Sequence, residues 1–158
     1  MQPLHIAFYQ PEIPQNVGAA IRLAACLNVG MDIIHPCGFP WDERKIRQSA
    51  LDYWQMLSLH KHESWSAFQA AYAQPKRRVI LMSTKAAVSY TEFEFQTGDI
   101  LLAGQESAGV PEDIHSAVHA RVFIPMADGA RSLNVVNATS MIAGEALRQI
   151  ALRGKEAV

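Results

Sequence analysis

The chain alternates short apolar runs with longer segments in which apolar residues recur at helical spacing. Runs of strand length occupy residues 4–9, 31–35, 79–82, 99–103 and 122–124, with a further candidate at 53–59. Helical spacing occurs over residues 15–28, 43–50, 64–73 and about 134–153. Continuously apolar strands that alternate with helices are typical of a parallel sheet buried on both sides. The pattern therefore predicts an α/β fold with a mostly parallel sheet and helices on both faces.

The first predicted helix carries a charged residue of interest. Pro14 suits the first helical position, and apolar residues recur along one side of residues 15–28. Gly18 and Arg22 are four residues apart, which places them on the same helix face. We expect Arg22 to lie back over the bare Gly18 toward the preceding loop. The alternative is an ordinary surface arginine beside a tolerated glycine.

The composition is that of a globular chain. Of 158 residues, 49% are hydrophobic and 18% are charged, which favours one domain spanning residues 1–158. Charged residues interrupt the longest apolar runs, so no membrane-spanning segment is expected. The amino terminus lacks a basic segment and a cleavage site, so we expect no signal peptide and a cytoplasmic location. Cys26 and Cys37 are then expected to be reduced thiols.

The charge of the chain argues against nucleic-acid binding through bulk charge but allows binding through a local basic cluster. The formal net charge of −1 argues against a protein that coats nucleic acid through bulk charge. Two local basic clusters remain, each either a nucleic-acid contact or ordinary solvated surface. They are Arg44, Lys45 and Arg47, on a helix that Asp42 is expected to cap, and Lys76, Arg77 and Arg78. His60 and His62 invite a metal, but no further ligands at suitable spacing accompany them, so we expect none.

A turn after one buried strand is the first candidate site. Residues 101–111 read LLAGQESAGVP, so the strand ends at Gly104 before a helix, as in dinucleotide-binding turns. Glu106, however, stands where that fingerprint has its middle glycine, and its carboxylate would repel a pyrophosphate. The sequence also lacks a Gly-x-x-x-x-Gly-Lys phosphate loop. The turn therefore disfavours NAD and ATP and favours a ligand without phosphate that bears a positive centre.

The last strand and helix frame the second candidate site. Residues 121–148 read RVFIPMADGARSLNVVNATSMIAGEALR, which is a strand stopped by Pro125, a polar loop and a helix. A polar loop between a buried strand and a helix N-terminus is where α/β proteins place ligands. Ser132 lacks the Gly-x-Ser-x-Gly elbow of hydrolases. Ser132 and Asn134 either cap the helix or line a site, and both roles remain open.

Three separated blocks join these two sites into a longer pattern. The blocks are Pro14-Gln15-Asn16-Val17-Gly18 with Arg22, then GQESAG at residues 104–109, then Ile124-Pro125-Met126 followed by Ser132-Leu133-Asn134-Val135. In order and approximate spacing they resemble the motifs of the SPOUT superfamily of RNA methyltransferases. The stretches YQPEIPQNVG, GFPWDERKIRQSALDY and EALRQ extend the similarity to the minimal, single-domain TrmL type over nearly the whole chain.

The resemblance implies a fold, a cofactor and a partner. Members of this superfamily form an α/β sheet whose carboxyl-terminal segment threads a loop in a deep trefoil knot, and they work as homodimers. They bind S-adenosylmethionine, release S-adenosylhomocysteine and need no metal. The TrmL type methylates the ribose 2′-OH of the wobble nucleotide, a cytidine or a modified uridine, in the anticodon of leucine tRNAs. The expected partner is therefore the anticodon stem–loop of tRNA, with no DNA and no membrane.

The resemblance also implies roles for the matching positions. The expected catalytic residues are Arg22, Asn16, Glu106, Ser132 and Asn134. The expected cofactor-binding residues are Met82, Ser83, Gly104, Ile124, Met126, Ser132 and Leu133. Two roles for Arg22 remain open: a general base toward the 2′-OH, or a charged group that clamps the adjoining phosphate. We favour the second because a guanidinium resists deprotonation.

Other interpretations share the same pattern. A 2′-O-methyltransferase for another tRNA or rRNA site, a non-catalytic RNA-binding protein on this fold, and a small-molecule methyltransferase remain alternatives. Ala143 and Gly144 permit close helix approach, which fits either a dimer contact or packing within one subunit. Ala108 stands where relatives commonly have a basic residue. RNA contacts are then expected at other cations, namely Arg44, Lys45, Arg47 or Arg131.

Overall fold

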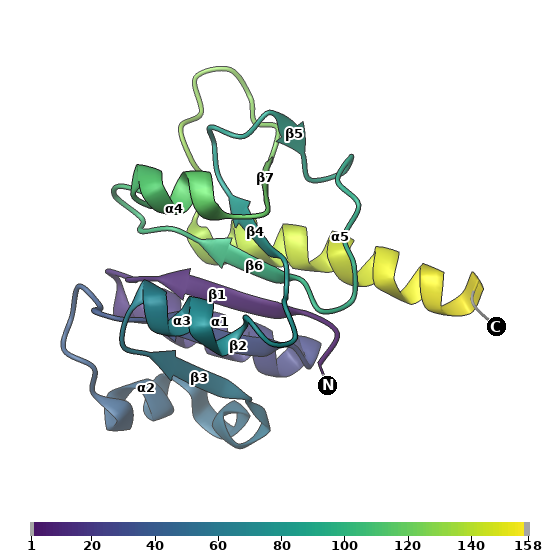
Figure 1. Cartoon of the computed structure of the whole chain (residues 1–158). Coiled ribbons are helices and arrows are strands. Elements are labelled where there is room, and N and C mark those ends of the chain that lie inside the picture. The colour runs from purple at the N-terminus through teal and green to yellow at the C-terminus, as the bar shows by residue number, and fades with distance from the viewer. Residues whose placement is uncertain (1, 157–158) are drawn as a thin grey trace.

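One parallel sheet forms the centre of the computed structural model, which describes residues 2–156 (Figure 1). Within that range the sheet has seven strands: β1 (His5–Tyr9), β2 (Gly30–Ile34), β3 (Leu59–His62), β4 (Val79–Met82), β5 (Val88–Ser89), β6 (Ile100–Ala103) and β7 (Ala120–Phe123). Their order is β3-β2-β1-β6-β4-β7-β5, and every neighbouring pair is parallel. The prediction of a mostly parallel α/β sheet is confirmed.

Helices cover both faces of the sheet, as predicted. They are α1 (Pro14–Leu27), α2 (Glu43–Ala50), α3 (Trp65–Ala71), α4 (Glu112–Ala117) and α5 (Val135–Glu156), with a 3₁₀ helix, η1, at Leu51–Met56. On one face, α1 and α5 bury Ile21 and Ile142. On the other face, α3 and α4 bury Phe68 and Ile114. Because successive strand residues point to opposite faces, both sides of each central strand need apolar residues, which explains the continuous apolar runs.

The strand predicted over residues 53–59 was wrong. Residues 53–56 belong to η1, residues 57–58 connect it to β3, and β3 begins only at Leu59. Tyr53 and Trp54 favour strands in general, but η1 buries none of its residues, so nothing draws them into the sheet. β3 lies at the edge of the sheet, where His60 and Lys61 are exposed. An edge strand needs no continuous apolar run, so the sequence pattern does not reveal it.

Strand order brings distant loops together at one edge of the sheet. β1 pairs with β2 on one side and with β6 on the other, so the chain leaves β1 and β6 in opposite directions. Open parallel sheets bind ligands beyond the carboxyl ends of strands at such a reversal. The loops after β1, β4, β6 and β7 all open at this edge. The trefoil knot that the resemblance implies stays a prediction.

The carboxyl-terminal helix is tied to the segment between β5 and β6. Gln149 accepts a hydrogen bond from the Phe95 amide at 2.9 Å and donates to the Phe93 carbonyl at 3.0 Å. Arg153 donates to the Phe95 carbonyl at 2.7 Å. The first turn of α5 lies at the carboxyl edge of the sheet. These bonds hold the later turns of the helix against residues 93–95. Among residues 2–156, no helix combines the length and the apolar character that crossing a membrane requires.

Candidate active site

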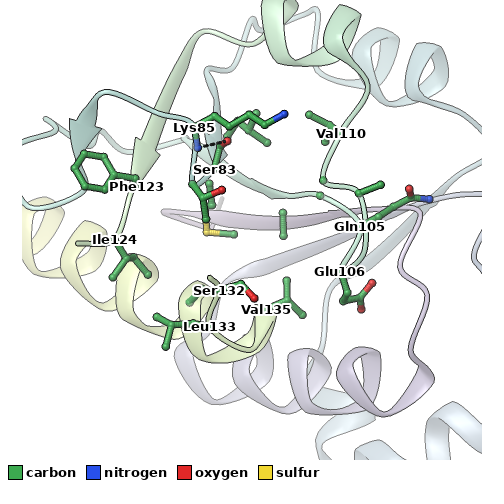
Figure 2. A pocket seen from close by; sticks show the side chains of 18 of the residues that line it. Ser83, Lys85, Gln105, Glu106, Val110, Phe123, Ile124, Ser132, Leu133 and Val135 are labelled. Atoms are coloured by element: carbon green, nitrogen blue, oxygen red, sulfur yellow. Dashed lines mark hydrogen bonds between the residues drawn. The ribbon is translucent and has the colours of Figure 1, made fainter. Parts of the chain in front are cut away.

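A cavity of about 740 Å³ opens beyond the carboxyl ends of β4, β6 and β7. Its size lies within the range of about 300–1,000 Å³ that is usual for small-molecule sites. Every residue that the sequence predicts to bind cofactor lines this cavity: Met82, Ser83, Gly104, Ile124, Met126, Ser132 and Leu133. In Figure 2, Ser83 and Ile124 lie on one side, Glu106 on the opposite side, and Ser132 and Leu133 between them at the base of the view. Residues from four separate segments thus meet around one space.

The turn after β6 forms one wall of the cavity and is closed by its own backbone. The amide of Gln105 donates to the Gly109 carbonyl at 2.8 Å, and the Gly109 amide donates back at 2.9 Å. A Cβ on Gly104 would lie 2.5 Å from the carbonyl carbon of Gly109, a distance that no side chain tolerates. Gly109 itself has φ +67°, in the left-handed region that favours glycine. Both glycines are therefore required for the shape of the turn rather than for phosphate binding.

The turn holds Glu106 in a fixed position at the cavity wall. The backbone amide of Glu12 donates to Glu106 Oε2 at 3.1 Å. The side-chain amide of Asn16 donates to Glu106 Oε1 at 3.2 Å. Both carboxylate oxygens therefore have a donor from the segment that follows β1. Asn16 and Glu106, two of the expected catalytic residues, are therefore in direct contact.

Glu12 belongs to this site, although no pattern in the sequence indicates it. Its Oε1 accepts hydrogen bonds from the Ser107 amide at 3.0 Å and from the Ser107 hydroxyl at 2.7 Å. These two bonds lower the pKa of Glu12 below its ordinary value. Glu12 thus anchors the turn after β6 through its side chain and orients Glu106 through its backbone. It lies in a proline-flanked loop without periodicity, so only the pairing of β1 with β6 reveals its role.

Asn134 connects the start of α5 to the same network. Its Oδ1 accepts from the backbone amides of Val136 at 2.9 Å and Asn137 at 3.2 Å, which caps the helix. Its Nδ2 donates to Asn16 Oδ1 at 3.1 Å. One side chain therefore caps the helix and joins the site at once, which combines the two roles that the sequence left open. The cap is supplied by Asn134, while Ser132 lines the cavity.

Arg22 is the one predicted site residue that does not line the cavity. Its side chain is exposed, and its guanidinium carbon lies 5.1 Å from the centre of the Tyr53 ring. The expectation that Arg22 lies over Gly18 was wrong, because Ser49 of α2 occupies that space. A Cβ on Gly18 would lie 2.5 Å from the Ser49 hydroxyl. Gly18 therefore permits α1 and α2 to pack closely, and Arg22 extends toward η1 instead.

Of the two histidines considered for a metal, His62 belongs to a buried network around Asp32, whereas His60 is exposed at the edge of that network. His62 bonds to Asp32 Oδ1 at 2.7 Å, His5 bonds to Asp32 Oδ2 at 2.9 Å, and the Tyr72 hydroxyl donates to Asp32 Oδ1 at 2.6 Å. The ring of His60 stacks against that of His5. Burial favours the neutral form of Asp32, but the hydrogen bonds outweigh it and hold the pKa at about 2. An ionised carboxylate therefore joins β1, β2, β3 and the end of α3.

Comparison with known proteins identifies relatives that match nearly the whole chain. The model of the SpoU rRNA Methylase family matches residues 3–144. A tRNA (cytidine(34)-2′-O)-methyltransferase from Beijerinckia indica subsp. indica is 49% identical over 150 residues, which cover 95% of this chain and 94% of that protein. A solved structure from work on the 2-OH methylation of C/U34 on tRNA has a TM-score of 0.88 and 40% identity, with 97% of this chain and 98% of that chain covered.

A more distant neighbour was solved with a cofactor. The SpoU methyltransferase AviRb from Streptomyces viridochromogenes, in complex with AdoMet, has a TM-score of 0.82 and 26% identity. The similarity covers 94% of this chain and 61% of AviRb. The resemblance found in the three sequence blocks is thus confirmed by full-length relatives and by the fold. On the extent of the family match and the identity to its relatives, the chain belongs to the SpoU methylase family.

Proposed function

We propose that the chain transfers a methyl group from S-adenosylmethionine to the ribose 2′-OH of the wobble nucleotide of tRNA, position 34. Relatives covered almost end to end carry this activity in their names. The observation that carries the proposal is the hydrogen-bonded chain from Asn134 through Asn16 to Glu106 along one side of the cavity. It sets polar groups beside a space of cofactor size. The finer proposal is that leucine tRNAs, with a wobble cytidine or modified uridine, are the substrates.

The chemistry of the cavity fits S-adenosylmethionine. Met82, Ile124 and Leu133 offer apolar walls to a nucleoside, and Ser83 and Ser132 offer hydroxyl groups. The carboxylate of Glu106 places negative charge where a positive centre would be stabilised. When bound, the cofactor supplies a methyl group on a positively charged sulfur and leaves as S-adenosylhomocysteine. We assign its binding to the seven predicted residues Met82, Ser83, Gly104, Ile124, Met126, Ser132 and Leu133.

We assign the polar side chains at the rim of the cavity, two of which also face the cofactor, to the RNA side of the reaction. Asn16, Glu106, Ser132 and Asn134 hold the ribose hydroxyl in line with the transferred methyl group, and such alignment supplies much of the rate. Arg22 binds the phosphate beside that ribose through its positive charge, because a guanidinium offers N–H donors in a planar fork and resists deprotonation. Its exposure and its place outside the cavity support a contact with RNA rather than with cofactor. The hydroxyl proton then passes to solvent.

We further propose that the chain works as a homodimer that pairs through α5. Met141 and Leu152 on this helix are 42% and 46% exposed. A Cβ on Gly144 would meet no atom within 4 Å, so this side of the helix is open. A second copy of the chain would cover these apolar side chains. The mass of the protein in solution tests this, and a monomer at micromolar concentration would contradict it.

We also propose that residues 1–158 form one methyltransferase domain and that it acts in the cytoplasm.

The activity is tested by labelled methyl transfer. Purified protein is incubated with S-adenosylmethionine that carries a radioactive methyl group and with total tRNA from cells that lack the enzyme. We expect incorporation into tRNA, and none into tRNA from cells that already contain it. Total rRNA and a DNA oligonucleotide serve as substrate controls. Cofactor binding without incorporation into any tRNA would contradict the proposed function.

A further inference from the structure

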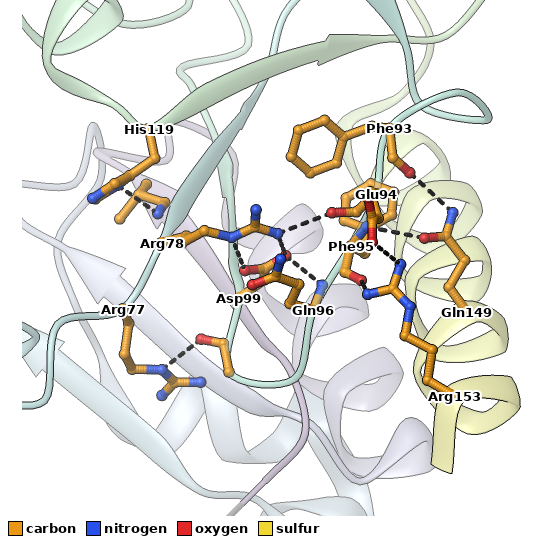
Figure 3. Close-up of polar contacts among 12 residues, drawn as sticks. Arg77, Arg78, Phe93, Glu94, Phe95, Gln96, Asp99, His119, Gln149 and Arg153 are labelled. Atoms are coloured by element: carbon orange, nitrogen blue, oxygen red, sulfur yellow. Dashed lines mark hydrogen bonds and ion pairs between the residues drawn. The ribbon is translucent and has the colours of Figure 1, made fainter. Parts of the chain in front are cut away.

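The structure separates the two basic clusters found in the sequence. Arg77 donates to the Gly98 carbonyl at 2.6 Å, and Arg78 bonds to both oxygens of Asp99 at 2.8 and 2.7 Å (Figure 3). Asp99 is itself buried. These cations therefore fix the entry to β6 at the amino-terminal ends of the strands, far from the cavity. Arg77 and Arg78 are thus held by hydrogen bonds within the protein, and only Lys76 of this cluster is exposed to solvent.

The other basic cluster lies on the outside of α2. Arg44, Lys45 and Arg47 are exposed, and the side chain of Arg47 is 57% accessible. Asp42 accepts from the amides of Arg44 and Lys45, so its charge is directed at the start of the helix. α2 carries these three cations and one carboxylate, Glu43, which accepts a hydrogen bond from Arg47 at 2.8 Å, so the helix keeps a net positive charge. α2 therefore presents positive charge to solvent.

Two arginines lie over aromatic rings of the neighbouring 3₁₀ helix. The guanidinium of Arg47 lies 5.0 Å from the centre of the Trp54 ring, and that of Arg22 lies 5.1 Å from the Tyr53 ring. A stacked guanidinium is oriented by its face and keeps N–H groups at its edge that can meet phosphate oxygens. Beside these pairs, Leu51 and Met56 are 63% and 64% exposed. Oriented cations and open apolar side chains together suit a strand of unpaired nucleotides.

This surface continues into the candidate active site. The close approach of Gly18 to Ser49 sets α2 directly against α1. α1 also carries Asn16, which lines the cavity, and Arg22, which stacks on η1. A strand that places one ribose at the cavity would therefore have its neighbouring nucleotides near α2 and η1.

We propose that Arg44, Lys45, Arg47, Leu51, Trp54 and Met56, here termed the α2–η1 surface, bind the single-stranded anticodon loop next to the nucleotide that is methylated. The cations hold backbone phosphates, and the apolar and aromatic side chains contact unstacked bases. This inference rests on the proposed tRNA methyltransferase function and adds to it the surface that selects a loop rather than a duplex.

Binding of a fluorescein-labelled anticodon stem–loop of leucine tRNA, measured without cofactor over a range of salt concentrations, tests the proposal. Replacing Arg44 and Arg47 together by alanine should make the plot of log affinity against log salt shallower by about 1.4, which is about 0.7 for each lost phosphate contact. Trp54→Ala should raise Kd about tenfold through lost stacking. Arg47→Lys should keep the salt dependence but weaken binding, because lysine lacks the planar group.

The matched control is Lys76→Ala, which removes an exposed cation near the amino-terminal end of β4 and should leave Kd unchanged. Thermal unfolding of each variant checks that the fold persists. The proposal is overturned if Lys76→Ala weakens binding as much as the α2 variants, since bulk charge would then suffice. It is also overturned if the α2 and η1 variants bind RNA normally, including the case in which they change only the oligomeric state. Methylation by the wild-type protein is measured separately, so failure of the proposed function is distinguishable from failure of this surface.

Discussion

The side-chain amide of Asn134 donates to the side-chain oxygen of Asn16 at 3.1 Å, although 118 positions separate the two residues. The bond links the first turn of α5 to the first turn of α1. From Asn16 the network continues to Glu106 in the turn after β6. Hydrogen bonds between side chains thus connect the three separated blocks of the sequence. Each of these three side chains can be tested alone, because a replacement of nearly the same shape removes its hydrogen bond.

Asn134 has two roles that substitution can separate. Aspartate at this position keeps an oxygen for capping but lacks the donor to Asn16, whereas alanine loses both. We expect Asn134→Asp to retain thermal stability and Asn134→Ala to lose about 1 kcal/mol of unfolding free energy. Both variants should lose on the order of 10²-fold in kcat, because the reacting groups are misplaced. Full turnover by Asn134→Asp would show that the bond to Asn16 is dispensable.

Gly104 is expected to be intolerant of even one added carbon. In Gly104→Ala the new Cβ would overlap the backbone of Gly109, so the turn must shift. Overlap of this kind costs about 1–3 kcal/mol. We expect the Kd for S-adenosylhomocysteine, measured by calorimetry, to rise about tenfold. Gly154→Ala is the control, because its Cβ would meet no atom within 4 Å, and it should bind normally. If both variants bound S-adenosylhomocysteine with equal affinity, the turn after β6 would not be part of the cofactor site.

Arg22 is expected to act through charge and shape rather than as a base. Arg22→Lys keeps the positive charge but loses the two-pronged contact with phosphate and the stacking on Tyr53. We expect kcat/KM for tRNA to fall on the order of 10²-fold, with cofactor affinity unchanged. Tyr53→Phe keeps a ring beneath the guanidinium and should be nearly neutral. Near-full turnover by Arg22→Lys, at unchanged RNA affinity, would rule out the proposed clamp.

The buried network around Asp32 predicts a specific response to acid. The folded pKa of about 2 lies below the ordinary value of 3.8, so the carboxylate stabilises the fold above about pH 4 and loses that contribution as the pH falls toward 2. Tyr72→Phe removes one donor to this carboxylate. At pH 7 the free energy of unfolding should fall by about 1.5–3 kcal/mol. In urea unfolding series the difference from wild type should shrink between pH 4 and pH 2. If the difference in unfolding free energy between Tyr72→Phe and wild type stayed constant from pH 4 to pH 2, lost packing around the ring would explain it instead of the lost hydrogen bond.

Periodicity predicted the buried parts of the fold and missed the exposed ones. Central strands such as β4 and β6 are apolar on both faces, and their positions are confirmed. β3 at the edge and the two-residue β5 carry no such signal, and the aromatic residues of η1 imitate a strand without entering one. The sequence pattern cannot report which strands become neighbours, since that depends on contacts between distant segments.

The site was predictable only where its residues fall in recognisable blocks. Gly104, Ser132 and Leu133 were placed in the cofactor pocket by resemblance, and all three line the cavity. Glu12 was missed because its partner, Ser107, lies 95 positions away and meets it only when β1 pairs with β6. The contact that Gly18 makes with Ser49 was missed for the same reason. The catalytic roles of Arg22, Asn16, Glu106, Ser132 and Asn134 stay predictions.

The central claim is tested most directly by locating the methyl group on the product RNA. Leucine tRNA from cells lacking the enzyme is treated with the protein and S-adenosylmethionine, digested with ribonuclease and sequenced by mass spectrometry. We expect one added methyl group, on the ribose of nucleotide 34, and its formation on the order of 10²-fold more slowly when Asn134→Ala replaces the wild-type protein at equal cofactor occupancy. A methyl group on a base, or on a ribose outside the anticodon, would contradict the account.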